Sequence, residues 1–231
     1  MNKEEKSLLL ALSLGDGSIS LRRNNEQKIY TACLQIIHSE SQIEYLKFKR
    51  NLLQKIIGGY EIKISEFKPT TGYRASKSFR INKAHKYFRL LHRWLYSNDG
   101  KKEYTRKILN RLTPQGLAIW YMDDGCGKKR KDKNGNVTSI SCHLSTYCSE
   151  QEADAIIKYF SEVWNITWKK KFHKRPALWY LDMSVEESKK FEELIKDHVI
   201  PSMQYKLPSF YFGKSAEPSL TGDDIVRTAG N

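Results

Sequence analysis

Two short stretches decide the fold: LLALSLGDG at residues 9–17 and LAIWYMDDG at residues 117–125. Each one runs through about two helical turns of mostly apolar residues and then ends in an aspartate followed by a glycine. Gly17 and Gly125 suit the left-handed backbone position that commonly ends a helix. We therefore predict two short buried helices, each of which presents its aspartate at its carboxyl end.

Small residues on the first of these helices favour close packing between the two. Ala11 and Gly15 are four residues apart and so lie on one face of the helix. A partner helix can approach that face closely, which would bring Asp16 and Asp124 side by side. Two adjacent carboxylates repel each other, and a divalent cation between them removes the conflict. Oxygen ligands of this kind suit Mg²⁺, and metal ions in a basic groove are suited to phosphodiester hydrolysis.

The order of elements after each motif repeats along the chain. Ser41 and Ser149, which we predict to cap helices, each follow the motif aspartate by 25 residues. A third strand is expected 44 residues after Asp16 and 43 residues after Asp124. The pattern predicts an α+β fold of two αββαββα repeats, each with a four-stranded antiparallel sheet. The expected divisions are a first repeat over 1–97, a linker over 98–113, a second repeat over 114–209 and a loose tail over 210–231.

The expected strands have one apolar and one polar face. The stretch 137–146, VTSISCHLST, alternates along its whole length. Its Ile140 and Leu144 lie on one face, and His143 lies on the other face among serines. The stretch 60–67, YEIKISEF, alternates in the same way. Such sheets bury one face against helices and leave a cationic or hydroxyl-bearing face open.

The composition indicates a polyanionic partner. The 231 residues carry 40 Lys and Arg against 26 Asp and Glu, a formal net charge of +14. Residues 1–116 alone account for a net charge of +13. No apolar run approaches the roughly 18 residues of a membrane span, which argues against a membrane protein. The four cysteines match no standard zinc-ligand spacing and indicate a reducing compartment.

Both motifs resemble the signature sequences of the LAGLIDADG homing endonucleases, in their single-chain form with two motifs. The longer stretch LTPQGLAIWYMDDG at 112–125 matches well, and IPSMQYKLP at 200–208 is typical of intron-encoded members. The resemblance covers residues 1–209, although Ser13 and Gly15 depart from the pattern of the first motif. It implies that the two signature helices pack together and that the two sheets form a DNA-binding saddle.

The resemblance also implies a function. The chain would be a monomeric, metal-dependent endonuclease that hydrolyses phosphodiester bonds at a specific site in double-stranded DNA. Mg²⁺ would be the cofactor, with Mn²⁺ or another divalent cation as a substitute. Because the repeats differ in sequence, we expect a long, asymmetric target. The alternative is a maturase that binds intron RNA, or a DNA-binding regulator that does not cleave. The expected location is inside the cell, in an organelle (mitochondrion or chloroplast) or in bacterial or phage-infected cytoplasm.

Several site residues follow from the resemblance. Asp16 and Asp124 would be the essential metal-binding carboxylates, one for each strand cut. The backbone carbonyls of Gly15 and Asp123 would also ligate metal. Lys206, within the later IPSMQYKLP stretch, would polarise water or stabilise developing charge at one site.

The first-repeat equivalent of Lys206 stays open between two neighbours. Lys101 and Lys102 follow Asp16 by 85 and 86 residues. Lys206 follows Asp124 by 82 residues, so the spacing alone does not choose between them.

Further polar residues lie on the expected strands. Gln35 sits where the family often keeps a catalytic polar residue that orders water, and His143 is its counterpart, since each follows its motif aspartate by 19 residues. Cations near the open strand faces are candidates for DNA contact, with arginine suited to guanine and lysine to phosphate. These candidates are Arg22, Arg23, Lys63, Arg74, Lys77, Arg80, Lys128, Lys129, Arg130, Lys169, Lys171, Lys174 and Arg175.

Overall fold

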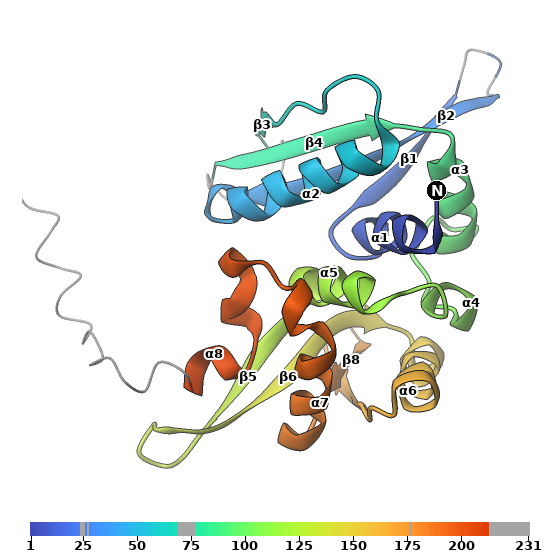
Figure 1. Cartoon of the computed structure of the whole chain (residues 1–231). Helices are drawn as coiled ribbons and strands as arrows, with labels where there is room; N and C mark the ends of the chain where they lie inside the picture. Colours follow the sequence, from blue (N-terminus) through green and yellow to red (C-terminus); the bar gives the residue numbers. More distant parts are fainter. Residues whose placement is uncertain (24–25, 27, 69–76, 176, 213–231) are drawn as a thin grey trace, which may run out of the picture.

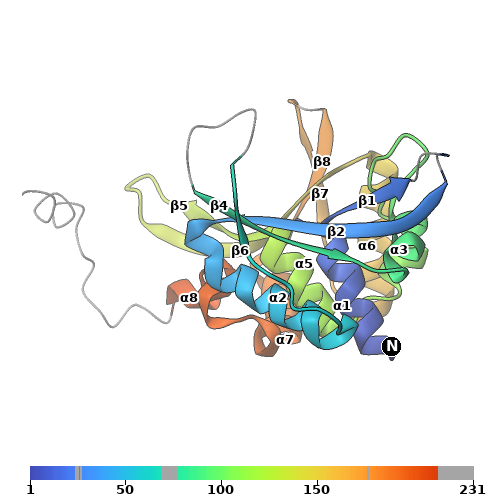
Figure 2. The ribbon, with the colours of Figure 1, turned by 90° about the horizontal axis from the view of Figure 1, so that it is seen from above.

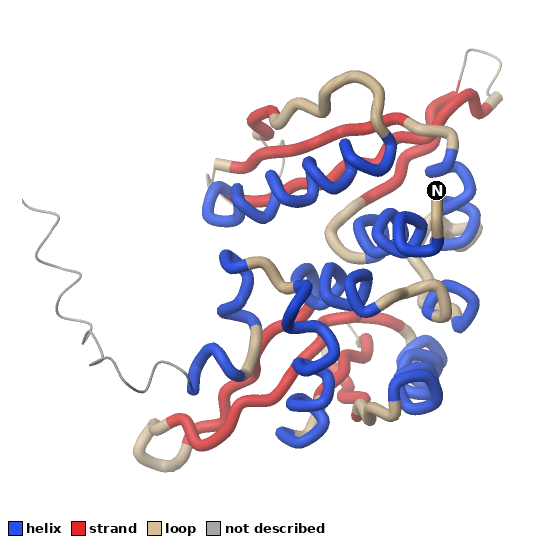
Figure 3. The backbone as a smooth tube through the Cα atoms, viewed as in Figure 1, coloured by secondary structure: helices blue, strands red, loops and turns tan. Residues whose placement is uncertain are grey.

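The computed structural model describes residues 1–23, 26, 28–68, 77–175 and 177–212. Within that part of the chain, eight strands form two separate four-stranded antiparallel sheets (Figures 1 and 3). The strand orders, β1-β2-β4-β3 and β5-β6-β8-β7, are equivalent, which confirms the predicted α+β fold of two repeats. The strand bounds are β1 Ser18–Arg23, β2 Ile29–Ser39, β3 Ser65–Phe67, β4 Ser78–Ala84, β5 Gly125–Lys131, β6 Val137–Cys148, β7 Lys169–His173 and β8 Leu178–Asp182.

Helices gather on one side of both sheets and leave the opposite faces open (Figure 2). Their bounds are α1 Lys3–Leu14, α2 Ile43–Ile57, α3 Tyr87–Leu95, α4 Arg106–Leu109, α5 Pro114–Asp124, α6 Glu150–Trp164, α7 Val185–Ile195 and α8 Ser209–Phe212. Short 3-10 helices cover Glu40–Gln42, Lys196–His198 and Pro201–Lys206. None of the helices in the described segments is long and apolar enough to cross a bilayer.

Helices α1 and α5 lie side by side at the centre of the molecule (Figure 1). Every residue from Ser7 to Leu14 and from Gly116 to Met122 is buried, because helices this apolar have to be surrounded by protein. Gly116 permits the contact, since a Cβ there would stand 2.4 Å from Oγ of Ser7. That Oγ also accepts a hydrogen bond of 2.8 Å from the backbone N–H of Thr113, the cap of α5.

The alternating pattern of β6 gives the second sheet its two faces. Ile140, Cys142 and Leu144 are buried, as predicted, whereas His143 and Ser145 between and beside them are partly exposed. The cap of α6 is also as predicted: Ser149 and Glu152 form a reciprocal capping box.

The predicted cap of α2 is wrong. The chain turns earlier than expected, through the 3-10 helix Glu40–Gln42, so that α2 begins only at Ile43. The Oγ of Ser41 is hydrogen-bonded to the Oγ of Ser39 (2.9 Å) instead of capping a helix.

The strand predicted over 60–67 is also shorter than expected, and the glycine argument needs correction. Only Ser65–Phe67 forms a strand, because the backbone N–H of Ile62 donates to the Gln54 side chain (2.8 Å) and not to a neighbouring strand. Neither Gly17 nor Gly125 has the predicted left-handed backbone, and Gly125 is extended (φ −92°). Glycine is needed there for space, since a Cβ would stand 2.2 Å from the Tyr121 ring.

Candidate active site

The side chain of Asp123 joins the two motifs. It is fully buried, and its Oδ2 accepts a hydrogen bond of 3.0 Å from the backbone N–H of Asp16. Gly15 leaves room for this carboxylate, because a Cβ on Gly15 would stand 2.2 Å from Oδ2 of Asp123. The prediction that Gly15 allows a close approach between the two motif helices is confirmed.

A lysine of α2 neutralises this buried carboxylate. The Nζ of Lys49, a side chain with no exposed surface, donates to Oδ1 of Asp123 (2.5 Å). The hydroxyl of Tyr45 donates to the same oxygen (2.7 Å). Burial alone would raise the pKa of Asp123, but Lys49 and Tyr45 outweigh it and hold that pKa below the usual range. Asp123 is therefore an ionised, fully partnered group.

Asp16 lies at the edge of this buried cluster. Its Oδ2 is 3.8 Å from Nε2 of His38 and 3.9 Å from Nζ of Lys49, and its side chain keeps 38% of its surface exposed. Burial, and then the nearby charge of Asp123, raise the pKa of Asp16 to about 6. Burial and Lys49 lower the pKa of His38 to about 4, so this imidazole is neutral at pH 7.

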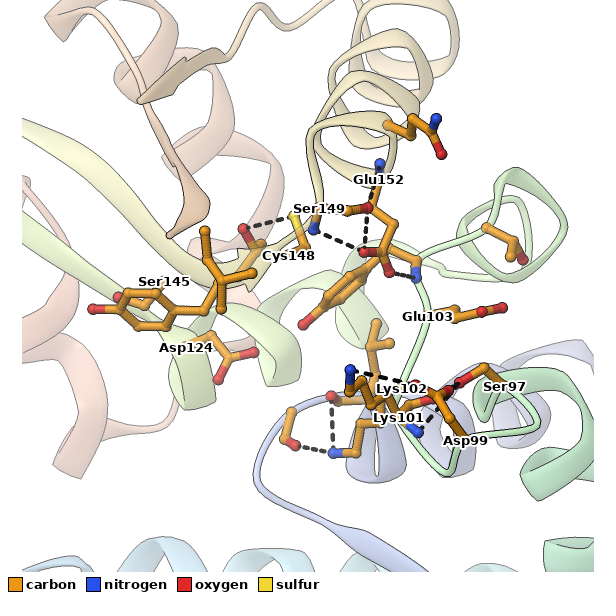
Figure 4. A pocket seen from close by; sticks show the side chains of 18 residues that line it. Ser97, Asp99, Lys101, Lys102, Glu103, Asp124, Ser145, Cys148, Ser149 and Glu152 are labelled. Atoms are coloured by element: carbon orange, nitrogen blue, oxygen red, sulfur yellow. Dashed lines mark hydrogen bonds and ion pairs between the residues drawn. The ribbon is translucent and has the colours of Figure 1, made fainter. Parts of the chain in front are cut away.

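Asp124 occupies the corresponding place at the end of α5, in a different setting. Its Oδ2 accepts a hydrogen bond of 3.0 Å from Nε1 of Trp120, one helical turn earlier. Burial, followed by the charges of Asp123 and Asp16, raises the pKa of Asp124 to about 7. Asp124 and Lys102 line one pocket together with Ser145 and neighbouring residues of β6 (Figure 4).

Two lysines bind the carboxyl ends of the two motif helices in matching ways. The Nζ of Lys102 donates to the carbonyl oxygens of Gly15 and Gly17, both at 2.6 Å. The Nζ of Lys206 donates to the carbonyl of Asp123 at 2.9 Å and also to that of Met122. Burial lowers the pKa of both ammonium groups. Each lysine thus adds positive charge beside one motif aspartate.

Lys101 lies elsewhere. Its side chain is 82% exposed and its Nζ is 3.3 Å from a carboxylate oxygen of Asp99. Of the two candidates that the spacing left open, Lys102 is therefore the one whose position matches that of Lys206.

Gln35 and His143 occupy matching positions in the two sheets. Within the part of the chain that the structure describes, neither forms a hydrogen bond or ion pair with a motif aspartate. Gln35 pairs with Asn82 in the β2–β4 ladder and donates to its side chain (3.1 Å). His143 pairs with Asp182 in the β6–β8 ladder and shares a hydrogen bond with that carboxylate (2.7 Å). The residue of the first sheet that lies beside Asp16 is His38, three positions beyond Gln35.

The candidate DNA-contacting cations are distributed over several surfaces. By strand alternation, six of them share the open faces: Arg22, Arg80, Lys128, Arg130, Lys169 and Lys171. Arg23 ends β1 beyond a register shift, Lys63 and Lys77 lie outside the strands, and Lys174 and Arg175 lie in the turn after β7.

Lys129 is the exception among the strand cations. It points to the helix-covered side of its sheet, with its Nζ 4.0 Å from the ring centre of Tyr211. Arg74 and residues 213–231 of the predicted tail lie outside the described residues.

The donor set fits a divalent cation at the two motif aspartates. The charge of Asp123 raises the pKa of both Asp16 and Asp124, and the charge of Asp16 also raises the pKa of Asp124. Of these three carboxylates, Asp123 is the one that a lysine ammonium hydrogen-bonds. Carboxylate oxygens with excess negative charge are the ligands that Mg²⁺ prefers. Asp16, His38 and Asp123 also have potential ligand atoms within 4.8 Å of one another, but the Lys49 ammonium already bonds the latter two.

Four residues around the aspartates were not identified from the sequence: His38, Tyr45, Lys49 and Trp120. The burial of Lys49 could have been predicted from the sequence. Tyr45, Lys49 and Leu53 recur at helical spacing, so they lie on one face of α2, and that face is buried. A charged residue on such a stripe requires a buried partner. Trp120 is one turn before Asp124, so its contact also follows from helix geometry.

The sequence model of the LAGLIDADG DNA endonuclease family matches residues 6–191 of the chain. This segment includes both motifs and the aspartates of the site. The chain belongs to the LAGLIDADG DNA endonuclease family. Its two motifs and two sheets make it a single-chain LAGLIDADG protein with two repeats.

The chain is also similar to individual proteins of known name. Protein RecA of Mycolicibacterium flavescens is 26% identical over 219 residues, which cover 93% of this chain and 49% of that protein. The probable intron-encoded endonuclease 1 of Wickerhamomyces canadensis is 30% identical over 123 residues, 53% of this chain and 52% of that protein. The chain therefore matches about half the length of these two relatives.

Solved structures show the same fold. The homing endonuclease I-WcaI, bound to its DNA recognition sequence, superposes with a TM-score of 0.70 at 22% identity, covering 89% of this chain and 86% of that one. The LAGLIDADG homing endonuclease I-GzeII, in complex with its DNA target, gives a TM-score of 0.52 at 9% identity, covering 98% and 96%.

Proposed function

We propose that this chain is a monomeric, site-specific endonuclease that cuts both strands of double-stranded DNA. The observation that carries the proposal is the pairing of Asp16 and Asp124 at the adjacent ends of α1 and α5, where the strands β1 and β5 of the two open sheets begin. Family membership and the net charge of +14 support the same substrate.

The two aspartates are the proposed metal ligands, one for each DNA strand. LAGLIDADG endonucleases depend on divalent metal ions in general. We take Mg²⁺ as the natural ion and Mn²⁺ as a substitute. A bound Mg²⁺ supplies Lewis-acid stabilisation of the phosphoryl oxygens and the leaving oxygen. The carbonyls of Gly15 and Asp123 each retain a second lone pair beside the lysine hydrogen bond, so they can join the ligand set.

The protein's own groups supply the rest of the site. Water is the nucleophile, and the P–O bond to the leaving sugar oxygen breaks, so no covalent enzyme intermediate is required. Lys102 and Lys206 add fixed positive charge where negative charge develops on the phosphate. Trp120 orients the Asp124 carboxylate through its indole N–H.

The open faces of the two sheets are the proposed DNA-binding surface. A two-stranded β-ribbon fits the major groove, and each sheet presents cations with neighbouring polar side chains. The residues that read the duplex differ between the sheets: Gln35 and Asn82 in one, His143 and Asp182 in the other. A long target without palindromic symmetry follows from this difference.

The proposal is tested by incubating the protein with Mg²⁺ and a randomised duplex library and then sequencing the cleaved ends. We expect one long, asymmetric site to be recovered. Asp124→Asn should bind that site but fail to cut one or both of its strands. If the wild-type protein cuts no duplex, the proposed function is wrong; if Asp124→Asn cuts both strands at the wild-type rate, Asp124 is not an active-site residue. Binding of structured intron RNA without DNA cleavage would favour a maturase.

A further inference from the structure

The Asp16 site contains the ammonium group of Lys49, and the matching position of the other repeat is not a lysine. The Nζ of Lys49 has no exposed surface and lies 2.5 Å from Oδ1 of Asp123, 3.0 Å from Nε2 of His38 and 3.9 Å from Oδ2 of Asp16. A buried ammonium costs free energy unless it is paired and hydrogen-bonded. Here its carboxylate partner comes from the other repeat, so the pair crosses the central helix interface.

Among its described residues, the second repeat has no equivalent of this pair. Lys49 lies nine residues before Gly58, the C-cap of α2, and Ile156 lies nine residues before Asn165, the C-cap of α6. Both side chains are fully buried. The counterpart of Asp123, the residue just before the other motif aspartate, is Gly15. The positions equivalent to Lys49 and Asp123 are therefore occupied by an isoleucine and a glycine.

The charges around Asp16 indicate what the pair does. The Asp123 carboxylate lies within hydrogen-bond distance of the Asp16 backbone, and without Lys49 its negative charge would repel the Asp16 side chain across a water-poor space. With Lys49 in place, an ammonium and the neutral imidazole of His38 both stand within 4 Å of Oδ2 of Asp16. These two groups favour one orientation of the Asp16 carboxylate.

We propose that Lys49 is a positioning residue for the Asp16 active site alone, held in place by Asp123 of the second repeat. The inference rests on the proposed function, in which Asp16 and Asp124 each serve one strand cut. The two strands are then cut by chemically unlike sites, and Lys49 controls the rate at only one of them.

The test measures the cleavage of each strand separately, on a duplex that carries the selected target and a different label on each strand. Lys49→Met alone leaves the Asp123 charge buried and unpaired. The double variant Lys49→Met/Asp123→Asn removes both charges and is therefore the variant that tests the proposal. Because the charge of Asp123 also raises the pKa of Asp124, the reference protein is Asp123→Asn alone, which makes the same change beside Asp124. Relative to this reference, we expect the cleavage rate of one strand to fall by about 10- to 100-fold, as for a misplaced catalytic group, while the other strand is little affected. A nicked duplex should accumulate.

Ile156→Met is the matched control, because it changes the equivalent buried position of α6 in the second repeat. It should leave the ratio of the two strand rates unchanged. Thermal melting and DNA affinity are measured for each variant, since a merely structural defect would slow both strands together.

Two further variants separate the possible failures. If the wild-type protein cuts neither strand, the proposed function itself fails; if Asp16→Asn and Asp124→Asn both cut the two strands at wild-type rates, the assignment of these aspartates to the active sites fails. If these variants lose cleavage but the Lys49→Met/Asp123→Asn protein keeps the strand ratio of the Asp123→Asn reference, or slows both strands equally, the inference about Lys49 is overturned while the endonuclease assignment stands.

Discussion

The carboxylate of Asp123 fills the space that a side chain at Gly15 would need. An ideal Cβ on Gly15 would stand 2.2 Å from Oδ2 and 2.5 Å from Cβ of Asp123. Gly15 belongs to the first motif and Asp123 to the second, so the two motifs interlock where their helices end. Only one of these two positions can carry a side chain while α1 and α5 keep their present separation.

Gly15→Ala should therefore destabilise the protein. The obstacle includes the Cβ of Asp123, which cannot rotate away, so we expect a loss of about 1–3 kcal/mol in the free energy of unfolding, as for an overpacked core. Denaturant unfolding measures it. The control is Gly116→Ala in a Ser7→Ala background, where the obstructing hydroxyl has been removed and the loss should be smaller. Wild-type stability of Gly15→Ala would contradict the interlock.

Asp124→Asn should stabilise the metal-free protein at alkaline pH. The folded-state pKa of Asp124, about 7, lies above its ordinary value of 3.8, so its contribution to stability is present below pH 3.8 and is lost as the pH rises through 7. Asparagine has no charge to lose and can still accept the Trp120 hydrogen bond.

The melting temperature is the measurement for this variant. In chelator at about pH 8, Asp124→Asn should melt higher than the wild type, by about 2–4 °C for each kcal/mol of relieved repulsion. At about pH 5 the difference should shrink, and saturating Mg²⁺ should stabilise the wild type more than the variant. A variant that melts lower than the wild type at both pH values would show that the Asp124 charge is already compensated.

Periodicity was sufficient to predict most of the fold. The strict alternation of β6 placed Ile140 and Leu144 in the core, and the unbroken apolar run before Asp124 required a helix enclosed by protein. The equal spacing of Gln35 and His143 from their motif aspartates also corresponds to equivalent ladder positions. These features are local, or repeat at a fixed interval, so they can be found in one sequence.

The side-chain contacts inside the site join residues that are far apart in the sequence, so local sequence patterns do not predict them. Lys49 and Asp123 are separated by 74 residues, and they meet because side chains of α2 reach the carboxyl end of α5. Local signals also mislead where the backbone takes another path: Ser41 has the spacing of a helix cap, yet the 3-10 turn at Glu40–Gln42 places it before the helix and turns its hydroxyl to Ser39.

Lys102→Met should abolish most cleavage, whereas Lys101→Met should not. The Lys102 ammonium binds the end of α1 and lines the pocket that contains Asp124, while the Lys101 side chain is 82% exposed beside Asp99. Loss of a preorganised charge at the reacting centre is expected to lower the single-turnover rate by about 100-fold or more, with DNA affinity largely kept. Equal rates for the two variants would remove Lys102 from the site.

Neighbouring lysines of β7 should differ in their effect on DNA binding. Lys171 lies on the open face of the second sheet, whereas Lys170 turns to the helix side and pairs with Glu150 (2.8 Å) and Asp154 (2.7 Å) of α6. If Lys171 neutralises a phosphate, Lys171→Ala should reduce the slope of log K against log salt by about 1 unit, because one fewer counterion is released on binding. Lys170→Ala, which removes the same formal charge from the opposite face, should leave that slope unchanged. The measurement is the DNA affinity of each variant across a series of salt concentrations. If both variants change the slope equally, the slope depends on net charge alone and does not identify the sheet face that contacts the duplex.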